Sequence, residues 1–335
     1  MENSLMLILL VYLISTIPFT YELWEVPTIE PLWSVNVSGH VRSIDIIDDY
    51  VAVYSKDNHT AFITLFNPQG DRLWSHTFDN ISWGDLAIFN DKIVFAGDSV
   101  FLLLSRQGNT VLKLPFNESV YRIDVQGDRI LVFTSTAVYV FNGTDFEKII
   151  HTNITPRFVD FKRDIIVACN FYGSKVVVFD FSGKLLWENH VKGHITDIDY
   201  KDGVIALCER WAIDKGSYME LHGHVKLYDY KGRQIWNRKS DEAWSVSLGN
   251  DFVAVGSSNV ELYSIPGELK WKEGFGVTEF SVEVKDGLIA GFITGKWLEM
   301  GGVFVFNKWG KPLFAYTTDR IVFCLLFRRK KGDIW

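Results

Sequence analysis

One short pattern recurs along this chain and limits what it can fold into. An apolar strand runs into a turn glycine, and a second strand places a large ring four residues after that glycine. The complete copies are Leu65–Trp74, Val178–Trp187, Leu227–Trp236, Leu262–Trp271 and Val305–Phe314. A weaker copy surrounds Gly108, with Leu112 in the ring position, and another surrounds Gly143, where we expect Phe146 or Ile149 in that position. Seven copies of one hairpin indicate a repeat protein.

A second hairpin alternates with the first. It consists of an apolar-alternating strand, a turn that contains an aspartate, and a short β-branched strand. The turn aspartates are Asp49, Asp91, Asp128, Asp164, Asp202, Asp251 and Asp286, at intervals of 35 to 49 residues. Aspartate beside asparagine or glycine is typical of tight hairpin turns, so we give these carboxylates a structural role. Two hairpins in about 40 residues predict repeating units of four short strands.

A four-stranded sheet cannot bury an apolar face alone, but several such sheets packed around an axis can. The sequence therefore predicts an all-β protein, a β-propeller of seven four-stranded blades. Leu32–Val37 and Ile321–Phe327 resemble spare strands, so a ring of eight blades with one abbreviated blade is the alternative. We expect a hydrophobic leader (1–24), a single propeller domain (31–327) and a short basic tail (328–335).

Composition supports a β-rich globular protein and argues against some partners. Hydrophobic residues make up 47% of the 335 and aromatic residues 15%, which is enough for a large core. A net charge of −7 disfavours a nucleic-acid partner, because phosphate binding needs a clustered basic surface. Cys169, Cys208 and Cys324 give no disulfide framework, so we expect small buried side chains, with a single bridge as the alternative.

The N-terminus and the asparagines together indicate export. Leu5–Ile17 is an uncharged apolar run with the length of a signal-peptide core. It could also stay in place as a membrane tether, and the alternative is a buried N-terminal segment. Six N-x-[ST] sequons accompany it: Asn36, Asn58, Asn80, Asn117, Asn142 and Asn153. We therefore expect an extracellular or cell-surface glycoprotein with an N-terminal hydrophobic signal.

The glycine–tryptophan hairpin resembles the repeat of the PQQ-type β-propellers, the superfamily of quinoprotein alcohol dehydrogenases and outer-membrane assembly lipoproteins. The resemblance covers about residues 32–327 and rests on Gly70/Trp74, Gly183/Trp187, Gly232/Trp236, Gly267/Trp271 and Gly310/Phe314. It implies that each ring docks between neighbouring blades. WD40 repeats are a poorer match, because no Trp-Asp pair closes any unit.

The same resemblance bears on catalysis. The enzymes of this superfamily bind PQQ and calcium, and many carry a vicinal cysteine pair over the cofactor. This chain has no adjacent cysteines and no evident calcium ligand set. The resemblance therefore points to the non-catalytic branch of the superfamily, with no cofactor.

Two blades exceed the repeat between their second and third strands. Blade 5 inserts Glu209–His222 and blade 7 inserts Thr294–Gly301. Connections that exceed a repeat commonly carry function, and exposed tryptophan is favoured at recognition sites. The candidate binding residues are Glu209, Trp211, Asp214, Trp244, Trp297 and Glu299. They would form an aromatic patch for a protein or glycan partner; the alternative is that the rings only cap the blades.

Histidines also gather in blade 5. His222 and His224, two positions apart on a strand, share a face and form a weak metal candidate with Glu220. Without a third strong ligand we assign no metal. The main prediction is a non-enzymatic recognition or scaffolding module at the cell surface, acting through the top-face connections of blades 5 to 7. One alternative is an enzyme with a central pocket for carbohydrate or a small molecule, and another is an intracellular scaffold.

Overall fold

The structure is a computed structural model that describes residues 33–318, apart from single residues and short stretches of which the longest are 275–279 and 294–300. It contains seven four-stranded antiparallel sheets. Each sheet is built from four consecutive strands, so that β1–β4 form blade 1 and β25–β28 form blade 7. The predicted propeller of seven four-stranded blades is confirmed.

The strands of blades 1 to 4 are β1 (His40–Ile47), β2 (Tyr50–Asp57), β3 (Thr60–Phe66), β4 (Arg72–Asp79), β5 (Gly84–Phe89), β6 (Lys92–Gly97), β7 (Val100–Ser105), β8 (Thr110–Pro115), β9 (Val120–Gln126), β10 (Arg129–Thr134), β11 (Ala137–Asn142), β12 (Asp145–His151), β13 (Pro156–Lys162), β14 (Ile165–Asn170), β15 (Lys175–Asp180) and β16 (Leu185–His190). Those of blades 5 to 7 are β17 (His194–Lys201), β18 (Val204–Asp214), β19 (Met219–Asp229), β20 (Gln234–Ser240), β21 (Ser245–Leu248), β22 (Phe252–Gly256), β23 (Asn259–Ser264), β24 (Leu269–Gly274), β25 (Phe280–Lys285), β26 (Leu288–Ile293), β27 (Gly301–Asn307) and β28 (Pro312–Thr318).

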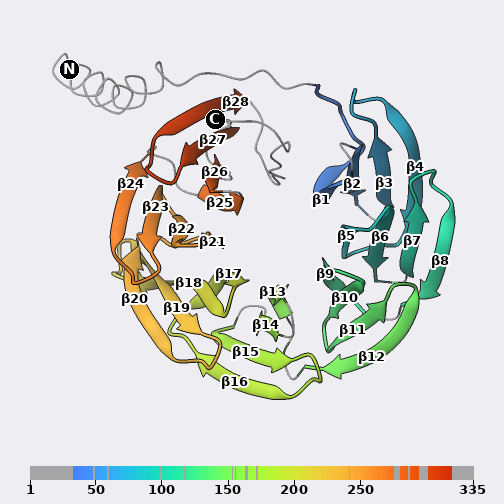
Figure 1. Cartoon of the computed structure of the whole chain (residues 1–335). Coiled ribbons are helices and arrows are strands. Elements are labelled where there is room, and N and C mark those ends of the chain that lie inside the picture. Colours follow the sequence, from blue (N-terminus) through green and yellow to red (C-terminus); the bar gives the residue numbers. More distant parts are fainter. Residues whose placement is uncertain are drawn as a thin grey trace, which may run out of the picture.

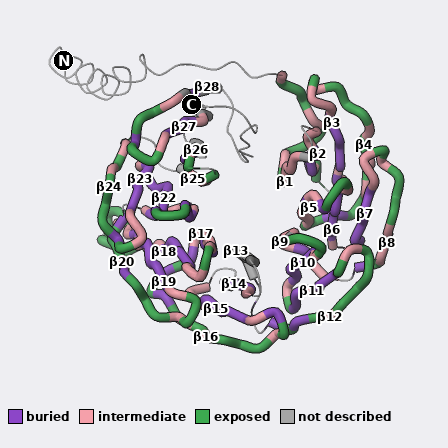
Figure 2. Tube along the Cα trace, in the orientation of Figure 1, coloured by how far each residue is buried: buried purple, intermediate pink, exposed green. Residues whose placement is uncertain are grey.

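The blades stand around a central axis. The first strand of each blade lies nearest the centre of the ring and the fourth strand forms the outer wall (Figure 1). Burial follows this order, with the middle strands buried and the outer strands largely exposed (Figure 2). In β4, exposed and half-buried residues alternate, because one face of the outer strand meets the neighbouring blade and the other meets solvent.

The core lies between the blades and not inside any one of them. One cluster, for example, joins Tyr54, Ile63 and Leu65 of blade 1 to Ile93 and Phe95 of blade 2. Blades 2 to 6 therefore bury both faces because each packs against a neighbour on either side, as expected for a ring of repeats.

On the outer rim, the rings that close the repeat lock one blade to the next. Each indole N–H donates to the carbonyl two residues before the following turn glycine: Trp33 to Pro68 (3.0 Å), Trp74 to Arg106 (2.8 Å), Trp187 to Tyr230 (2.9 Å), Trp236 to Ile265 (2.6 Å) and Trp271 to Lys308 (3.1 Å). At Gly267 the backbone has φ +91°, and an added Cβ would lie 2.7 Å from the Trp236 ring. Only glycine combines that conformation with so close an approach. The expected docking of rings between blades is confirmed at these positions.

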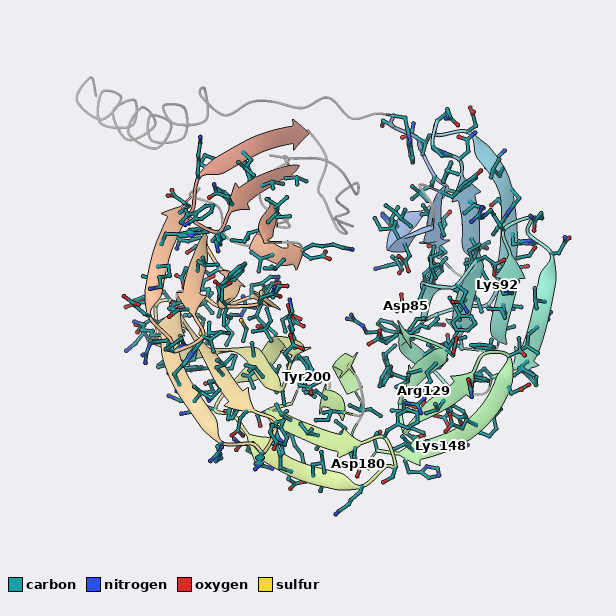
Figure 3. The ribbon with its side chains drawn as sticks, in the orientation of Figure 1. Asp85, Lys92, Arg129, Lys148, Asp180 and Tyr200 are labelled. Carbon is teal, nitrogen blue, oxygen red and sulfur yellow. The ribbon has the colours of Figure 1, made fainter. Side chains whose placement is uncertain are left out.

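Blade 3 corrects one expectation, since neither Phe146 nor Ile149 takes the ring position. Both side chains are exposed, because the strand register places Lys148 where blades 1, 4, 5 and 6 have tryptophan. The Lys148 ammonium donates to the Phe181 carbonyl and lies 4.0 Å from the Phe181 ring centroid. Ile150 supplies the contact with Gly183. Figure 3 shows Lys148 at the outer rim where blade 3 approaches Asp180 of blade 4.

Near the axis, short polar side chains join successive inner strands. The Asp197 carboxylate of β17 accepts from the Val246 N–H of β21 (3.0 Å), and the Ser245 hydroxyl of β21 accepts from the Val282 N–H of β25 (3.2 Å). Asp85 of β5 accepts in the same way from the Ile123 N–H (2.8 Å), and Figure 3 shows it on the inner strand. These hydrogen bonds fix the register of one blade against the next.

Burial changes the ionisation of these acids. Desolvation raises the pKa of Asp197 to about 6, against the hydrogen bonds from Val246 and Ser245, which lower it. The neighbouring Asp199 raises it further and Arg122 opposes that effect. Desolvation also raises the pKa of Asp45 and of Glu283.

Several sequence predictions concern smaller features. Cys169 and Cys208 are fully buried, as expected for small apolar side chains, and Cys324 lies outside the described residues. The leader (1–24) and the basic tail (328–335) also lie outside them. Among the described residues, no helix is long and apolar enough to cross a membrane.

Candidate recognition site on blade 5

The insertion in blade 5 is not a loop but a continuation of the sheet. Its second and third strands, β18 and β19, each run for 11 residues, whereas the corresponding strands β6 and β7 of blade 2 each have 6. Pairing continues without interruption from Val204 with Asp229 to Asp214 with Met219. Five additional residues per strand extend the hairpin by roughly 16 Å beyond the blade. We call residues 209–224 the blade 5 hairpin.

Two glycines hold the base of this hairpin. A Cβ at Gly193, in the connection before β17, would lie 2.3 Å from the Arg210 carbonyl oxygen. A Cβ at Gly223 would lie 2.4 Å from the Ala243 backbone nitrogen, in the connection that follows β20. The connections before β17 and after β20 are therefore in close contact with the hairpin backbone. These contacts fix the position at which the hairpin projects from the ring.

On one face of the hairpin, aromatic rings stack on Trp211. The His222 ring lies nearly parallel to it, with centroids 5.6 Å apart and an angle of 11°, and the His224 ring meets it edge-on at 5.0 Å. The Lys192 ammonium lies 4.5 Å from the Trp211 ring centroid. Trp211 thus connects the two strands of the hairpin to the connection from blade 4.

Below Trp211 a buried carboxylate joins three segments. The Glu209 side chain, only 1% exposed, accepts from the Lys226 ammonium (2.7 Å) and the Lys192 backbone N–H (3.0 Å). Its other near neighbour is Nδ1 of His224, at 3.6 Å. Desolvation lowers the pKa of His224. The negative charge of Glu209 raises this pKa, whereas the positive charges of Lys226 and Lys192 lower it further. His224 is therefore mostly neutral at pH 7, and Glu209 is balanced by Lys226.

The opposite face of the hairpin turns toward blade 6. The Arg210 guanidinium lies 4.2 Å from the centroid of the Trp244 ring, in the connection between β20 and β21. Trp244 is half-buried, and its backbone N–H donates to the Gly256 carbonyl (2.8 Å). Cation–π contacts therefore brace the hairpin from both neighbouring blades.

The tip of the hairpin is apolar and exposed. Ile213, Tyr218, Met219 and Leu221 are 37%, 61%, 57% and 40% exposed. The strand pairing places Ile213 on the face of Trp211 and places Met219 and Leu221 on the opposite face, with Tyr218 in the turn between the strands, so the end of the hairpin is apolar on both faces. We call these four residues the hairpin tip. Exposed large apolar side chains that lie close together are typical of contact surfaces.

The structure brings together some of the predicted site residues and separates others. Glu209 and Trp211 form one cluster with the two histidines, and Trp244 lies on the other side of the hairpin. Asp214 lies apart, near the tip, where its carboxylate accepts from the Gly216 N–H (2.7 Å) and shapes the turn. Trp297 and Glu299 of blade 7 lie outside the described residues.

Sequence reasoning missed the basic members of this site and the tip. Lys192, Arg210 and Lys226 lie in ordinary strands or connections and are recognisable only by the contacts they make. The tip had a signal, since Ile213 and Leu221 continue the apolar alternation of β18 and β19 past the length of the other blades.

The histidines are arranged for packing. His222 lies flat on Trp211, and its Nε2 is 3.3 Å from Oε1 of Glu220, whereas Oε2 of that carboxylate pairs with Lys215. In the described part of the chain, no group of three or more histidine, cysteine or acidic side chains could hold a metal ion.

Four of the six sequons lie in the described residues. Asn36, Asn58, Asn80 and Asn142 are all exposed. Asn58 and Asn80 have positive φ (46° and 61°), which asparagine tolerates in tight turns. Asn117 and Asn153 lie outside the described residues.

Comparisons with known proteins identify the fold. No protein-family model matches the sequence, and no curated protein is significantly similar to it. Among solved structures, Sqt1 of Saccharomyces cerevisiae is similar at a TM-score of 0.65 and 12% identity, over 83% of this chain and 85% of that one.

Two further structures extend the comparison. BamB of Moraxella catarrhalis is similar at a TM-score of 0.57 and 14% identity, over 82% of this chain and 87% of that one. The WD40 domain of Neurospora crassa Pan2 is similar at a TM-score of 0.54 and 13% identity, over 81% and 87%. At these identities the likeness concerns the fold, and this chain has the fold of a β-propeller.

Proposed function

We propose that this protein is a non-enzymatic recognition module that binds a partner protein through the hairpin tip on blade 5. The observation that carries the proposal is the exposure of four large apolar side chains on a hairpin that extends beyond the ring. Leaving them in water is unfavourable, by about 25 cal/mol for each Å² of apolar area that a partner could cover.

The bracing of the hairpin supports this function. A long hairpin without neighbours would sample many positions, and ordering it on binding would reduce affinity. Here the Glu209–Lys226 pair, the Trp211 stack and the Arg210–Trp244 contact hold its base. The tip is therefore presented in a fixed direction, so that less conformational entropy is lost when a partner binds.

The chemistry of the tip favours a protein over a glycan. Tyrosine and methionine are enriched in protein interfaces, where methionine adapts to irregular surfaces. Charged side chains border the apolar ones, among them Asp214 and the Lys215–Glu220 pair (3.1 Å). An apolar centre with a polar rim is the usual organisation of a protein–protein contact.

The central acids support a non-enzymatic role. The carboxylates of Asp45, Asp85 and Asp197 accept backbone hydrogen bonds from the neighbouring blade. They serve cohesion between blades. The rim hairpins likewise support a relationship to the non-catalytic PQQ-type propellers and carry no chemistry of their own.

We further propose that the protein is exported and N-glycosylated and acts at the cell surface, with the leader (1–24) as its signal or tether. The leader and the four exposed sequons support this localisation. Intact-mass measurement of the protein from its native host should give additional glycan mass. An unmodified full-length mass would contradict export.

Substitution of the hairpin tip tests the recognition proposal. We would cross-link tagged protein in its native host and quantify captured proteins for the wild type and for the variant Ile213→Ser, Tyr218→Ser, Met219→Ser and Leu221→Ser. The control variant carries Leu185→Ser, Leu186→Ser and Ile235→Ser, which remove equally exposed apolar side chains from outer strands. The tip variant should lose a partner that the control keeps; equal capture by both variants would contradict the proposal.

A further inference from the structure

The blade 5 hairpin extends past both strands that flank it in the sheet. The pairing of β17 with β18 reaches outward as far as Arg210, opposite His194, and the pairing of β20 with β19 reaches as far as Gly223, opposite Ser240. Beyond these residues the described sheet consists of β18 and β19 alone. A two-stranded extension has an edge on each side, and the backbone groups along an edge are available to a further strand.

The strand register shows which backbone groups point away from the hairpin. At the turn, the Lys215 N–H donates to the Tyr218 carbonyl (3.0 Å), so these two residues form a hydrogen-bonded pair. Hydrogen-bonded and non-hydrogen-bonded pairs alternate along an antiparallel ladder, so the first and third pairs after this one are not hydrogen-bonded. The β19 residues of those pairs are Met219 and Leu221. Their N–H and C=O groups therefore point away from β18.

The pairing at the base of the hairpin agrees with this assignment. Gly223 lies two residues beyond Leu221 along β19, so its backbone groups also point away from β18, and there they meet Ser240 of β20. Leu221 and Met219 continue the same edge past the end of β20. A strand added at this edge would lie in line with β20 and would meet the N–H and the C=O of both residues.

The two edges of the extension differ in their side chains. On the β19 edge the outward-bonding residues are Met219 and Leu221, which are 57% and 40% exposed and lie on the face opposite Trp211. On the β18 edge the corresponding residues are Ala212 and Asp214. A charged side chain at an edge is one of the features that discourage strand addition. The β19 edge is therefore the more favourable one, because an added strand would also cover apolar surface there.

The other face of the β19 edge is polar. Glu220 and His222 alternate with the apolar residues and lie on the face of Trp211. The Glu220 carboxylate pairs with Lys215 (3.1 Å), and its side chain is 41% exposed. Neighbouring strands pack side chains of the same face against one another. A segment that alternates apolar and polar side chains would therefore match both faces of this edge.

We propose that the β19 edge, Met219–His222, binds an extended segment of a partner protein by adding it to blade 5 as a strand, with apolar side chains of the segment beside Met219 and Leu221. This inference rests on the proposed function, since it specifies how the hairpin tip meets its partner. In such additions the main-chain hydrogen bonds supply affinity, and alternate side chains supply specificity.

Proline substitutions on the two edges test the strand addition. Leu221→Pro removes an N–H that points outward and spares the hydrogen bonds within the hairpin, and proline is tolerated at such edge positions. Ala212→Pro does the same on the opposite edge, and Leu221→Ala removes the side chain alone. The probe is the partner protein that the wild type captures by cross-linking in the native host, quantified for each variant. Leu221→Pro should capture about tenfold less of it than Leu221→Ala, whereas Ala212→Pro should match the wild type.

Amide hydrogen exchange tests the same contact without a substitution. It would be measured residue by residue by mass spectrometry, for the free protein and for the purified cross-linked complex. The N–H groups of Met219 and Leu221 should exchange about tenfold or more slowly in the complex than in the free protein, because each would be hydrogen-bonded to the added strand. The N–H groups of Ala212 and Asp214, on the opposite edge, should exchange at the same rate in both.

The possible results separate this inference from the recognition proposal. Equal capture by Leu221→Pro and Leu221→Ala, or unchanged exchange at Leu221 in the complex, would overturn the strand addition while recognition by tip side chains stands. Slower exchange at Ala212 in place of Leu221 would also overturn it, as would a complex formed with a second copy of this chain. If the variant with four serines at the tip captures the partner as the wild type does, the recognition proposal fails and the strand addition fails with it.

Discussion

Two kinds of hairpin in this molecule have opposite uses. The rim hairpins, each formed by the third and fourth strands of a blade, recur around the ring, and those of blades 2, 4, 5, 6 and 7 receive a side chain from the preceding blade at the turn glycine. The blade 5 hairpin, formed by the second and third strands, is longer than the corresponding hairpins of blades 1 to 4 and 6, and the side chains of its tip are exposed. The comparison teaches that repeated features of this chain supply cohesion, whereas the departure from the repeat supplies a surface. Substitutions on the rim should reduce stability and spare binding, and those at the tip should do the reverse.

The largest loss of stability is expected on the rim. Trp236 is 5% exposed and docks on Gly267, so Trp236→Ala should lower the free energy of unfolding by about 3–5 kcal/mol. Urea denaturation measures the loss. The control is Trp309→Ala, which removes an exposed tryptophan that docks on no glycine. Equal losses in the two variants would remove the distinction between docked and free rings.

A smaller effect on stability, one that depends on pH, is expected from Asp197 near the central axis. The pKa of Asp197 is about 6 in the folded protein against 3.8 ordinarily, so the folded state holds a proton that the unfolded state has lost between those values. Stability should therefore be greatest below pH 4 as far as Asp197 is concerned and fall as the pH rises to 6, by up to about 1.4 kcal/mol per pH unit. The total from this group is of order 3 kcal/mol.

The variant Asp197→Ser removes the titratable group and so isolates its pH-dependent contribution to stability. Serine can replace aspartate as the hydrogen-bond acceptor, because the Ser245 hydroxyl accepts from a backbone N–H of the next blade in the same way. Denaturation midpoints measured from pH 4 to pH 7 should show a shallower decline in the variant. Some decline should persist, because Asp45 and Glu283 also have raised pKa values. Identical pH profiles would show that Asp197 does not titrate in this range.

A smaller loss of stability is expected at the rim position of blade 3, where Lys148 stands in place of tryptophan. Lys148→Met keeps the length of the side chain but removes the hydrogen bond to Phe181, which should cost about 1 kcal/mol. Thermal unfolding measures the change. Lys184→Met, on the adjoining turn, is the exposed control and should be neutral. A neutral Lys148→Met would mean that Ile150 alone sustains this interface.

The smallest change in stability is expected at the hairpin tip. The tip side chains are exposed, so each substitution to serine should alter the free energy of unfolding by about 0.5 kcal/mol or less. Partner capture should nevertheless fall strongly. A large loss of stability in the tip variant would show that the tip packs on the protein itself.

The repeats explain how much of this fold could be predicted. The glycine turns and tryptophans predicted the blades and their docking, because both depend on local sequence and the geometry of strands. Lys148 was missed because an ammonium and an indole N–H can make the same hydrogen bond, and composition does not show that equivalence. Asp197 and Ser245 were missed because a polar residue in an alternating strand resembles a solvent-facing one, yet here each meets the backbone of the next blade.

The location of the candidate site was predicted from the sequence, but its secondary structure and side-chain contacts were not. The excess length of blade 5 and the presence of Trp211 were visible in the sequence. That the insertion would pair as strands, with Glu209 buried against Lys226, depends on contacts between segments far apart along the chain. Side-chain exposure at Tyr218 and Met219 likewise depends on how far the neighbouring blades extend.

Site-specific photocross-linking tests the central claim most directly. A photoreactive phenylalanine derivative placed at position 218 on the hairpin tip, or at position 146 on the outer strand of blade 3, would be activated in the native host. Both positions carry exposed aromatic side chains, so the comparison is matched. We expect a discrete cross-linked protein partner from position 218 and none from position 146. No product at position 218, or the same products at both positions, would contradict recognition by the blade 5 hairpin.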